Sequence, residues 1–326
     1  MYYFHKDNHY NQEKNVIKVK KKQTNKEISE QIKIWKKKRD AVILAHVYQP
    51  GEIQDVADFI GDSLFLSKQA AITKSKVILF CGVQFMAETA SILSPDKIVL
   101  LPDIDAGCPM ADMASVKDVK LKIKELQPVT VLSYVNSYAS VKALSDYCCT
   151  SANAVEVVQS IPKDKKILFL PDKNLARFTA KKTDKNIILW KGYCPAHNLL
   201  TKEDTLEAIN HHPNALLLVH PECPLEVCEM ADYIGSTKGI LDFVKNNSAQ
   251  EYIIGTEIGI LYPLKKQFPS KIFYPASNKM ICKDMKLISL EKILSSLQYL
   301  TPQVKVEENI RKNAMTALSR MMDITM

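Results

Sequence analysis

Glycine is scarce in this chain, and the glycine-rich motifs of nucleotide-binding folds are missing from it. Only 9 of the 326 residues are glycine. Neither GxGxxG, the mark of a dinucleotide-binding turn, nor the P-loop pattern GxxxxGK[ST] occurs. Both motifs use glycine to bring the backbone close to phosphate groups. The sequence therefore argues against a Rossmann dinucleotide site and against a P-loop kinase.

Long apolar runs are missing as well. No charge-free apolar run approaches the roughly 18 residues that a membrane span requires. The N-terminus is rich in lysine and asparagine and lacks the apolar segment of a secretory signal. An apolar content of 46% is ordinary for a globular protein. We expect a cytoplasmic protein without a membrane partner, long enough for two or three domains.

The positive charge is confined to one end of the chain. Of the net charge of +8, residues 1–40 carry +7, from twelve basic and five acidic residues. We predict a basic tail over residues 1–26, followed by a helix over KEISEQIKIWKKKR. A charged arm of this kind is more often solvated than a specific reader of DNA. We expect no nucleic-acid partner.

Cysteine is abundant, but its usual zinc spacing is absent. None of the eight cysteines forms a CxxC pair of the zinc-ribbon kind. In a reducing cytosol disulfides are not expected either. Metal binding, catalysis and simple packing remain as explanations for these thiols.

Three apolar segments each end in a pair of polar or aromatic residues two positions apart. The segments are AVILAHVYQ from residue 41, TVLSYVNSY from 130 and ALLLVHPEC from 215. Their pairs, which recur at intervals of 88 and 86 residues, are His46 and Tyr48, Tyr134 and Asn136, and His220 and Glu222. Side chains two apart on a strand point the same way, so each pair faces one side of a strand end.

The same residue types follow each pair at matching distances. A hydroxyl residue lies 17 positions after the first member of each pair, at Ser63, Ser151 and Thr237. An acid precedes each hydroxyl by five residues, at Asp58, Asp146 and Asp232, in stretches that we interpret as helical. One cysteine follows 62, 60 and 62 residues after the first member of each pair, at Cys108, Cys194 and Cys282. Agreement over three copies indicates a triplicated unit.

Each copy of about 86 residues is predicted to fold as β-α-β-α-β-α. Its last helix has an N-cap candidate and a proline near its end: Ser115 and Pro128, Thr201 and Pro213, Ser289 and Pro302. Alternating strands and helices predict an α/β fold. We expect three homologous αβα units with parallel sheets around a pseudo-threefold axis. Their predicted ranges are 27–128, 129–213, and 214–326 with a C-terminal helix.

The three equivalent cysteines are the best metal candidates. Ligands of α/β sheets bind outside the carboxyl ends of the strands, where the pairs, the hydroxyls and these cysteines all lie. Three converging thiolates suit a zinc ion or an iron–sulfur cluster, and the spacing does not choose between them. The other five have no counterparts and are predicted to be structural: Cys81, Cys148, Cys149, Cys223 and Cys228.

The rest of this pocket suggests acid–base chemistry on small anions. Hydroxyls at strand-to-helix turns suit a phosphate or a carboxylate. Tyr48, His220 and Glu222 are candidates for moving protons. Such a pocket favours condensation and dehydration over hydrolysis of a polymer.

Several long stretches resemble the quinolinate synthase (quinolinate synthetase A) family. They include AHVYQPGEIQDVADFIGDSL, AGCPMAD, YVNSYASVKALSDYCCTSANAV, GYCPAH, HPECPLEVCEMADYIGSTKGI and ICKDMKLISLEKI. In the family's order they cover about residues 40 to 320, nearly the whole chain.

The resemblance implies a [4Fe–4S] cluster on Cys108, Cys194 and Cys282. It implies condensation of iminoaspartate with dihydroxyacetone phosphate to quinolinate for NAD biosynthesis, with functional coupling to an L-aspartate oxidase or aspartate dehydrogenase. The implied catalytic residues are Tyr48, His197, His220 and Glu222, of which His197 comes from the resemblance alone. The implied substrate-binding residues are His46, Ser63, Tyr134, Asn136, Ser151 and Thr237.

Two other functions remain open. The three cysteines would also suit a zinc-dependent aldolase or lyase. A non-catalytic iron–sulfur redox sensor is the second alternative, although a sensor needs an exposed cluster rather than a buried polar pocket.

Overall fold

A computed structural model of the protein describes residues 23–324. The predicted basic tail over residues 1–26 lies almost entirely outside the described residues. The helix predicted after it is confirmed as α1 (Asn25–Arg39). Thr24 caps this helix by accepting a hydrogen bond from the Glu27 backbone N–H, and the Glu27 carboxylate accepts one in return.

In the part of the chain that the structure describes, twelve strands form three parallel sheets of four strands each. Their orders are β2-β1-β3-β4, β6-β5-β7-β8 and β10-β9-β11-β12, the same topology three times. The first sheet contains β1 (Ala41–His46), β2 (Phe59–Gly61), β3 (Val77–Cys81) and β4 (Ile98–Leu100). The second contains β5 (Thr130–Tyr134), β6 (Tyr147–Cys149), β7 (Ile167–Leu170) and β8 (Ile187–Leu189). The third contains β9 (Leu216–Val219), β10 (Tyr233–Ile234), β11 (Glu251–Gly255) and β12 (Ile272–Pro275).

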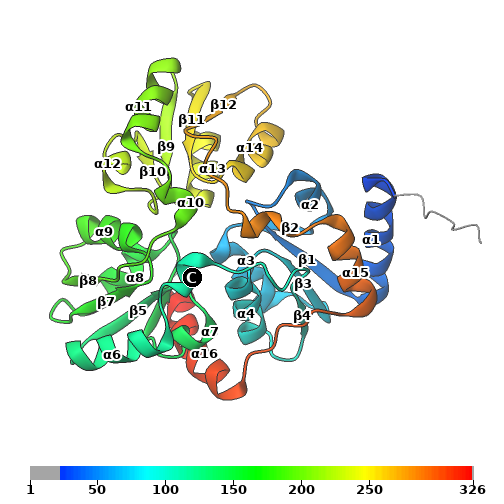
Figure 1. The fold of residues 1–326 in the computed structure, drawn as a ribbon, viewed down its shortest axis with the longest axis horizontal. Coiled ribbons are helices and arrows are strands. Elements are labelled where there is room, and N and C mark those ends of the chain that lie inside the picture. The colour runs from blue at the N-terminus through cyan, green and yellow to red at the C-terminus, as the bar shows by residue number, and fades with distance from the viewer. Residues whose placement is uncertain (1–22, 325–326) are drawn as a thin grey trace, which may run out of the picture.

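Figure 1 shows the three sheets with their helices arranged around a common centre. The expected α/β class with three similar units and parallel sheets is confirmed. One part of the expectation is wrong, because each unit has four strands rather than three. The extra strands β2, β6 and β10 fall in the acid-bearing stretches that the sequence suggested were helical.

The three repeated acids explain why these short edge strands form. Each edge strand begins immediately after one of these acids, Asp58, Asp146 or Asp232. Their carboxylates accept hydrogen bonds from the backbone N–H groups of Ile43, Val131 and Leu217, at 2.8, 2.8 and 2.7 Å. Each acid thus joins the segment leading to an edge strand to the central strand of its sheet, in the same way three times.

Helices surround the sheets. In the first unit they are α2 (Gly51–Val56), α3 (Ser63–Ile72), α4 (Gln84–Leu93), α5 (Pro109–Asp112) and α6 (Val116–Leu126). In the second they are α7 (Ala139–Lys142), α8 (Ala154–Ser160), α9 (Lys173–Lys182), α10 (Pro195–Asn198) and α11 (Lys202–His211). In the third they are α12 (Leu225–Cys228), α13 (Thr237–Asn246), α14 (Leu261–Gln267), α15 (Leu290–Tyr299) and α16 (Glu308–Ile324), with 3₁₀ turns at Ile258–Ile260 and Asp284–Lys286.

The closing helix of each repeat packs on the sheet of the next repeat. Its three predicted N-caps are confirmed: Ser115, Thr201 and Ser289 accept from backbone N–H groups at the starts of α6, α11 and α15. Helix α6 packs on β5 and β7, α11 packs on β9, and α15 packs back on α1 and β3. The residue boundaries of the three units stay a prediction, and this packing ties the units into a ring.

The last helix, α16, closes the fold. Its Ala314, Ala317, Leu318 and Met321 are buried among residues of the second unit. No helix within residues 23–324 is long and apolar enough to cross a membrane.

Candidate active site

All thirteen residues proposed from the sequence line one cavity between the three units. They are His46, Tyr48, Ser63, Cys108, Tyr134, Asn136, Ser151, Cys194, His197, His220, Glu222, Thr237 and Cys282. The cavity receives the carboxyl ends of β1, β5 and β9, as expected for parallel sheets. The structure therefore brings these residues together, while their individual roles stay predictions.

Two strand-end histidines are held by the same local turn. His46 Nδ1 accepts a hydrogen bond from the backbone N–H of Tyr48 at 3.2 Å, and His220 Nδ1 accepts one from Glu222 at 3.3 Å. An imidazole nitrogen that accepts must be unprotonated, so a neutral ring carries its proton on Nε2. Burial lowers the pKa of both His46 and His220 to about 3. Both side chains are therefore neutral Nε2–H donors at pH 7. His220 Nε2 lies 3.1 Å from Ser151 Oγ.

The three equivalent cysteines share a local setting. Cys108 and Cys194 are the N-caps of the one-turn helices α5 and α10, and Cys282 stands two residues before a 3₁₀ turn. Backbone N–H groups in these turns donate to all three thiol sulfurs. Burial outweighs this effect and raises the pKa of Cys282 to about 11 and of the other two further.

Exposure separates these cysteines from the rest. All eight are free thiols. The three equivalent cysteines are half-buried at the cavity, whereas the other five are buried: Cys81, Cys148, Cys149, Cys223 and Cys228. This agrees with a packing role for the five without counterparts.

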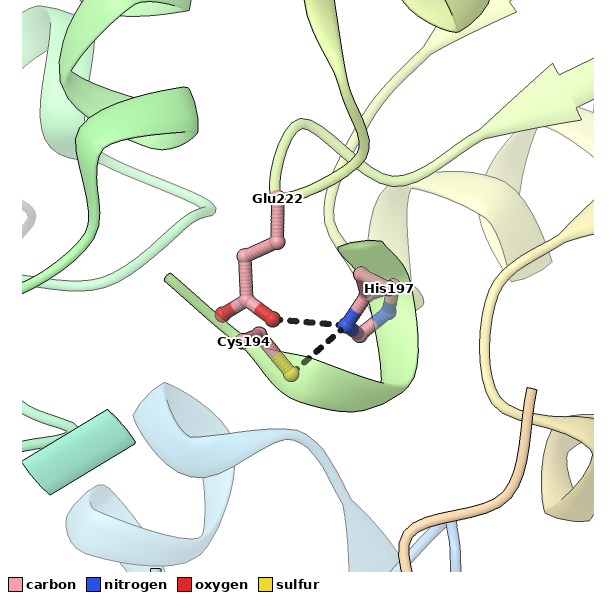
Figure 2. Close-up of side chains that lie close together, drawn as sticks. All are labelled: Cys194, His197 and Glu222. Carbon is pink, nitrogen blue, oxygen red and sulfur yellow. Dashed lines mark hydrogen bonds and ion pairs between the residues drawn. The ribbon is translucent and has the colours of Figure 1, made fainter. Parts of the chain in front are cut away.

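A chain of hydrogen bonds crosses the cavity wall from one unit to the next. Tyr48 Oη lies 2.7 Å from Thr256 Oγ1. The Thr256 hydroxyl in turn lies 2.8 Å from His197 Nε2. On the other side of the ring, His197 Nδ1 lies 2.7 Å from Glu222 Oε2 (Figure 2). A carboxylate, an imidazole and a hydroxyl in series form the arrangement that transfers protons in hydrolytic triads.

Glu222 is the charged centre of this wall. Burial alone would raise its pKa, but His197, His220 and a hydrogen bond from Tyr134 outweigh burial and hold the pKa of Glu222 below its usual range. Burial raises the pKa of Tyr48 and of Tyr134 well above 10. At pH 7 the Glu222 carboxylate is therefore ionised, and the Tyr48 and Tyr134 phenols keep their protons.

Sequence reasoning missed three residues that support this site. Asp172 and Glu257 each lie two residues after the second central strand of their unit, β7 or β11. The Asp172 carboxylate accepts the backbone N–H of Cys194 at 3.0 Å, and the Glu257 carboxylate accepts that of Cys282 at 3.2 Å. Asp172 and Glu257 stand at matching positions of two repeats, in the segments LPD and GTE, and this match could have revealed them. Thr256 had no such match, because no hydroxyl stands at its equivalents in the other copies.

Two arrangements of metal ligands compete at this cavity. Within residues 23–324, one set of three donor groups has all its atoms within 4.8 Å of one another: Cys194, His197 and Glu222. One zinc ion on three thiolates would need sulfurs about 3.8 Å apart, from Zn–S bonds of about 2.3 Å. The three cysteines do not form so compact a set, yet they face one cavity and influence one another electrostatically. Soft thiolates are ligands of iron–sulfur clusters as well as of zinc.

Comparison with known proteins identifies the family. The model of the family described as quinolinate synthetase A protein matches residues 30–323. The chain is 52% identical over 296 residues to quinolinate synthase of Thermodesulfovibrio yellowstonii, covering 90% of this chain and 97% of that protein. It is 50% identical over 298 residues to quinolinate synthase of Methanosarcina barkeri, covering 91% and 98%. The chain therefore belongs to the quinolinate synthetase A family and is an enzyme.

Proposed function

We propose that this enzyme is a quinolinate synthase of NAD biosynthesis. It condenses iminoaspartate with dihydroxyacetone phosphate, and quinolinate, phosphate and water leave. The observation that carries this proposal is that one cavity is lined by the three half-buried thiols and by all ten predicted polar side chains, from all three units. The match to quinolinate synthases supports this choice of reaction.

We assign a [4Fe–4S] cluster to Cys108, Cys194 and Cys282. A cluster with three protein thiolates leaves one iron open, and that iron supplies Lewis acidity for the loss of water. The thiols must lose their protons to bind iron. The backbone N–H groups that already donate to each sulfur would stabilise the resulting negative charge.

The anionic groups of the substrates would bind at helix N-termini. Ser63 and Thr237 are the first residues of α3 and α13, and both line the cavity. A helix N-terminus offers free backbone N–H groups and a favourable dipole to a phosphate or carboxylate. The neutral Nε2–H group of His46 adds a donor without adding a charge.

The second unit would orient the dicarboxylate. Tyr134 and Asn136 line the cavity from the end of β5 and the loop after it, and Ser151 lies beside His220. Asn136 Oδ1 is buried and has no hydrogen-bond partner among residues 23–324. Because an unsatisfied buried acceptor is costly, a substrate N–H or O–H group is its natural partner.

The chain from Glu222 through His197 and Thr256 to Tyr48 would move protons during ring formation. Condensation to an aromatic ring requires a proton to leave carbon and others to reach the departing oxygens. The Tyr48 phenol, which is protonated at pH 7, is placed as the acid. Glu222 and His197 are placed to take up a proton and return it through the Thr256 hydroxyl, while His220 contributes a second imidazole.

Supply of the first substrate suggests a partner. Iminoaspartate is an imine that hydrolyses in water, so an L-aspartate oxidase or an aspartate dehydrogenase must form it close by. We place this coupling in the cytoplasm, with no nucleic-acid or membrane partner.

The two alternative functions gain less support. A zinc lyase on the three cysteines conflicts with their wide spacing, because a single ion needs more compact ligands. A redox sensor without turnover conflicts with the enzymes that this chain matches over nine-tenths of its length.

The proposal is tested by an anaerobic assay of quinolinate formation from iminoaspartate and dihydroxyacetone phosphate. We expect turnover by the iron-loaded enzyme and a loss of about 100-fold or more in Tyr48→Phe, because general acid–base groups contribute about 10²–10⁴-fold. Tyr299→Phe, an exposed tyrosine on α15, is the matched control and should keep full activity. A Tyr48→Phe enzyme with full turnover would rule out the proton-transfer role of this phenol.

A further inference from the structure

The compact donor set at one edge of the cavity does not coincide with the three cysteines. Figure 2 shows Cys194 at the N-cap of the one-turn helix α10 and His197 on that helix, with Glu222 reaching them from the loop after β9. His197 Nδ1 lies 3.1 Å from Cys194 Sγ and 2.7 Å from Glu222 Oε2. Both His197 and Glu222 are buried, so this edge is shielded from water.

These three side chains are a ligand set that divalent transition ions prefer. A thiolate, an imidazole and a carboxylate each bind zinc, and three protein ligands with one open position are typical of catalytic zinc sites. A thiolate and a carboxylate together would also balance a charge of +2. In a tetrahedral zinc site neighbouring N, O and S donors are about 3.3–3.7 Å apart, so the imidazole would move away from its two neighbours by about half an ångström.

The surroundings of His197 favour this use. Thr256 Oγ1 lies 2.8 Å from His197 Nε2 and can accept its proton, which leaves Nδ1 free to bind an ion. A partner on the second ring nitrogen is the usual arrangement around a metal-bound histidine, because it fixes the orientation of the ring.

We propose that the cluster-free protein binds one divalent transition ion, such as Zn²⁺, through Cys194 Sγ, His197 Nδ1 and Glu222, with a fourth position open. Cys194 belongs to both this site and the proposed cluster. The ion and the cluster therefore exclude each other, and the ion must leave before a cluster can assemble. The exclusion rests on the proposed function, whereas the ion site itself does not.

The test uses the full chain without iron, titrated with Co²⁺ in place of Zn²⁺ under anaerobic conditions. We expect one Co²⁺ per chain with a thiolate-to-cobalt charge-transfer band and the intense visible bands of tetrahedral cobalt. Loss of a residue that hydrogen-bonds to a metal ligand weakens metal binding by about 10–100-fold. His197→Ala and Glu222→Gln remove a ligand itself, so each should weaken Co²⁺ binding by more than that. Thr256→Val, which removes such a hydrogen-bonding group, should weaken it by about tenfold.

Cys108→Ala separates the two sites. It removes a proposed cluster ligand but none of the three ion ligands, so Co²⁺ binding should be unchanged while iron–sulfur reconstitution fails. Circular dichroism and thermal unfolding check that each variant is folded. In the wild type, prior loading with Zn²⁺ should block reconstitution until a chelator is added.

Two results would overturn the proposal. Co²⁺ binding that is lost in Cys108→Ala would place the ion on the three thiols instead. No Co²⁺ binding by the folded wild type would remove the site altogether. If Co²⁺ binds as expected but no cluster assembles in the metal-free wild type, the proposed cluster fails and the ion site stands.

Discussion

At the scale of single residues, one hydrogen bond fixes the tautomer of each strand-end histidine. The backbone N–H two residues later holds Nδ1 of His46 and of His220 as an acceptor, which leaves Nε2–H as the donor. The alternation of side chains in a strand predicted that such pairs share a face. It did not predict the tautomer, because the turn that follows each strand determines it.

Thr256 offers the sharpest test among the residues that the sequence did not reveal. Thr256→Val keeps the shape but removes the hydroxyl between Tyr48 and His197. We expect kcat to fall by about 10²-fold at equal iron content, because a positioned proton-transfer group contributes about that much. Thr256→Ser should keep most of the activity. Equal kcat values for the valine variant and the wild type would contradict a relay through this hydroxyl.

At the scale of elements, the repeat predicted most of the fold. The central strands, the three N-caps and the helix-ending prolines all followed from residues at matching positions. The edge strands β2, β6 and β10 were missed because two or three residues are too few to show a period. The transfer of each closing helix to the next sheet was also not predictable, since amphipathic spacing says which face is buried but not on which sheet.

The acids that precede the edge strands make a prediction about stability. Asp146→Ala removes the acceptor of the Val131 N–H at the start of β5. We expect a loss of about 1.5–3 kcal/mol in the free energy of unfolding, the usual contribution of a hydrogen bond to a charged group. Urea unfolding with an unchanged m-value measures it. Asp164→Ala, in an exposed loop, is the control and should change stability by less than about 0.5 kcal/mol. Equal effects of the two variants would show that the repeated acid has no structural role.

At the scale of the whole molecule, the site exists only because three units enclose it. Its side chains come from strand ends and loops of all three sheets, and the cavity buries two histidines in neutral form. Equal spacing in three copies predicted which residues meet. Their distances, and the compact set at Cys194, depend on how the units pack, which no single repeat encodes.

Burial of neutral histidines makes the stability depend on pH. The pKa of His46 falls from 6.5 to about 3 on folding, so between these values the unfolded chain binds a proton that the folded chain does not. Stability is therefore lost as the pH falls below 6.5. Between pH 6.5 and 5 we expect a loss of about 2 kcal/mol from His46. His46→Gln should flatten the decline of the urea midpoint over this range, and an unchanged slope would contradict a buried neutral His46.

The central claim is that three equivalent cysteines hold one iron–sulfur cluster. The most direct test is the iron and acid-labile sulfide content of the full chain purified without oxygen, beside Cys108→Ala and the matched control Cys149→Ala, a buried thiol away from the cavity. We predict about four irons and four sulfides per chain in the wild type and the control, with both lost in Cys108→Ala. Zinc-free wild type that takes up no iron and sulfide on reconstitution, or full iron in Cys108→Ala, would contradict the account.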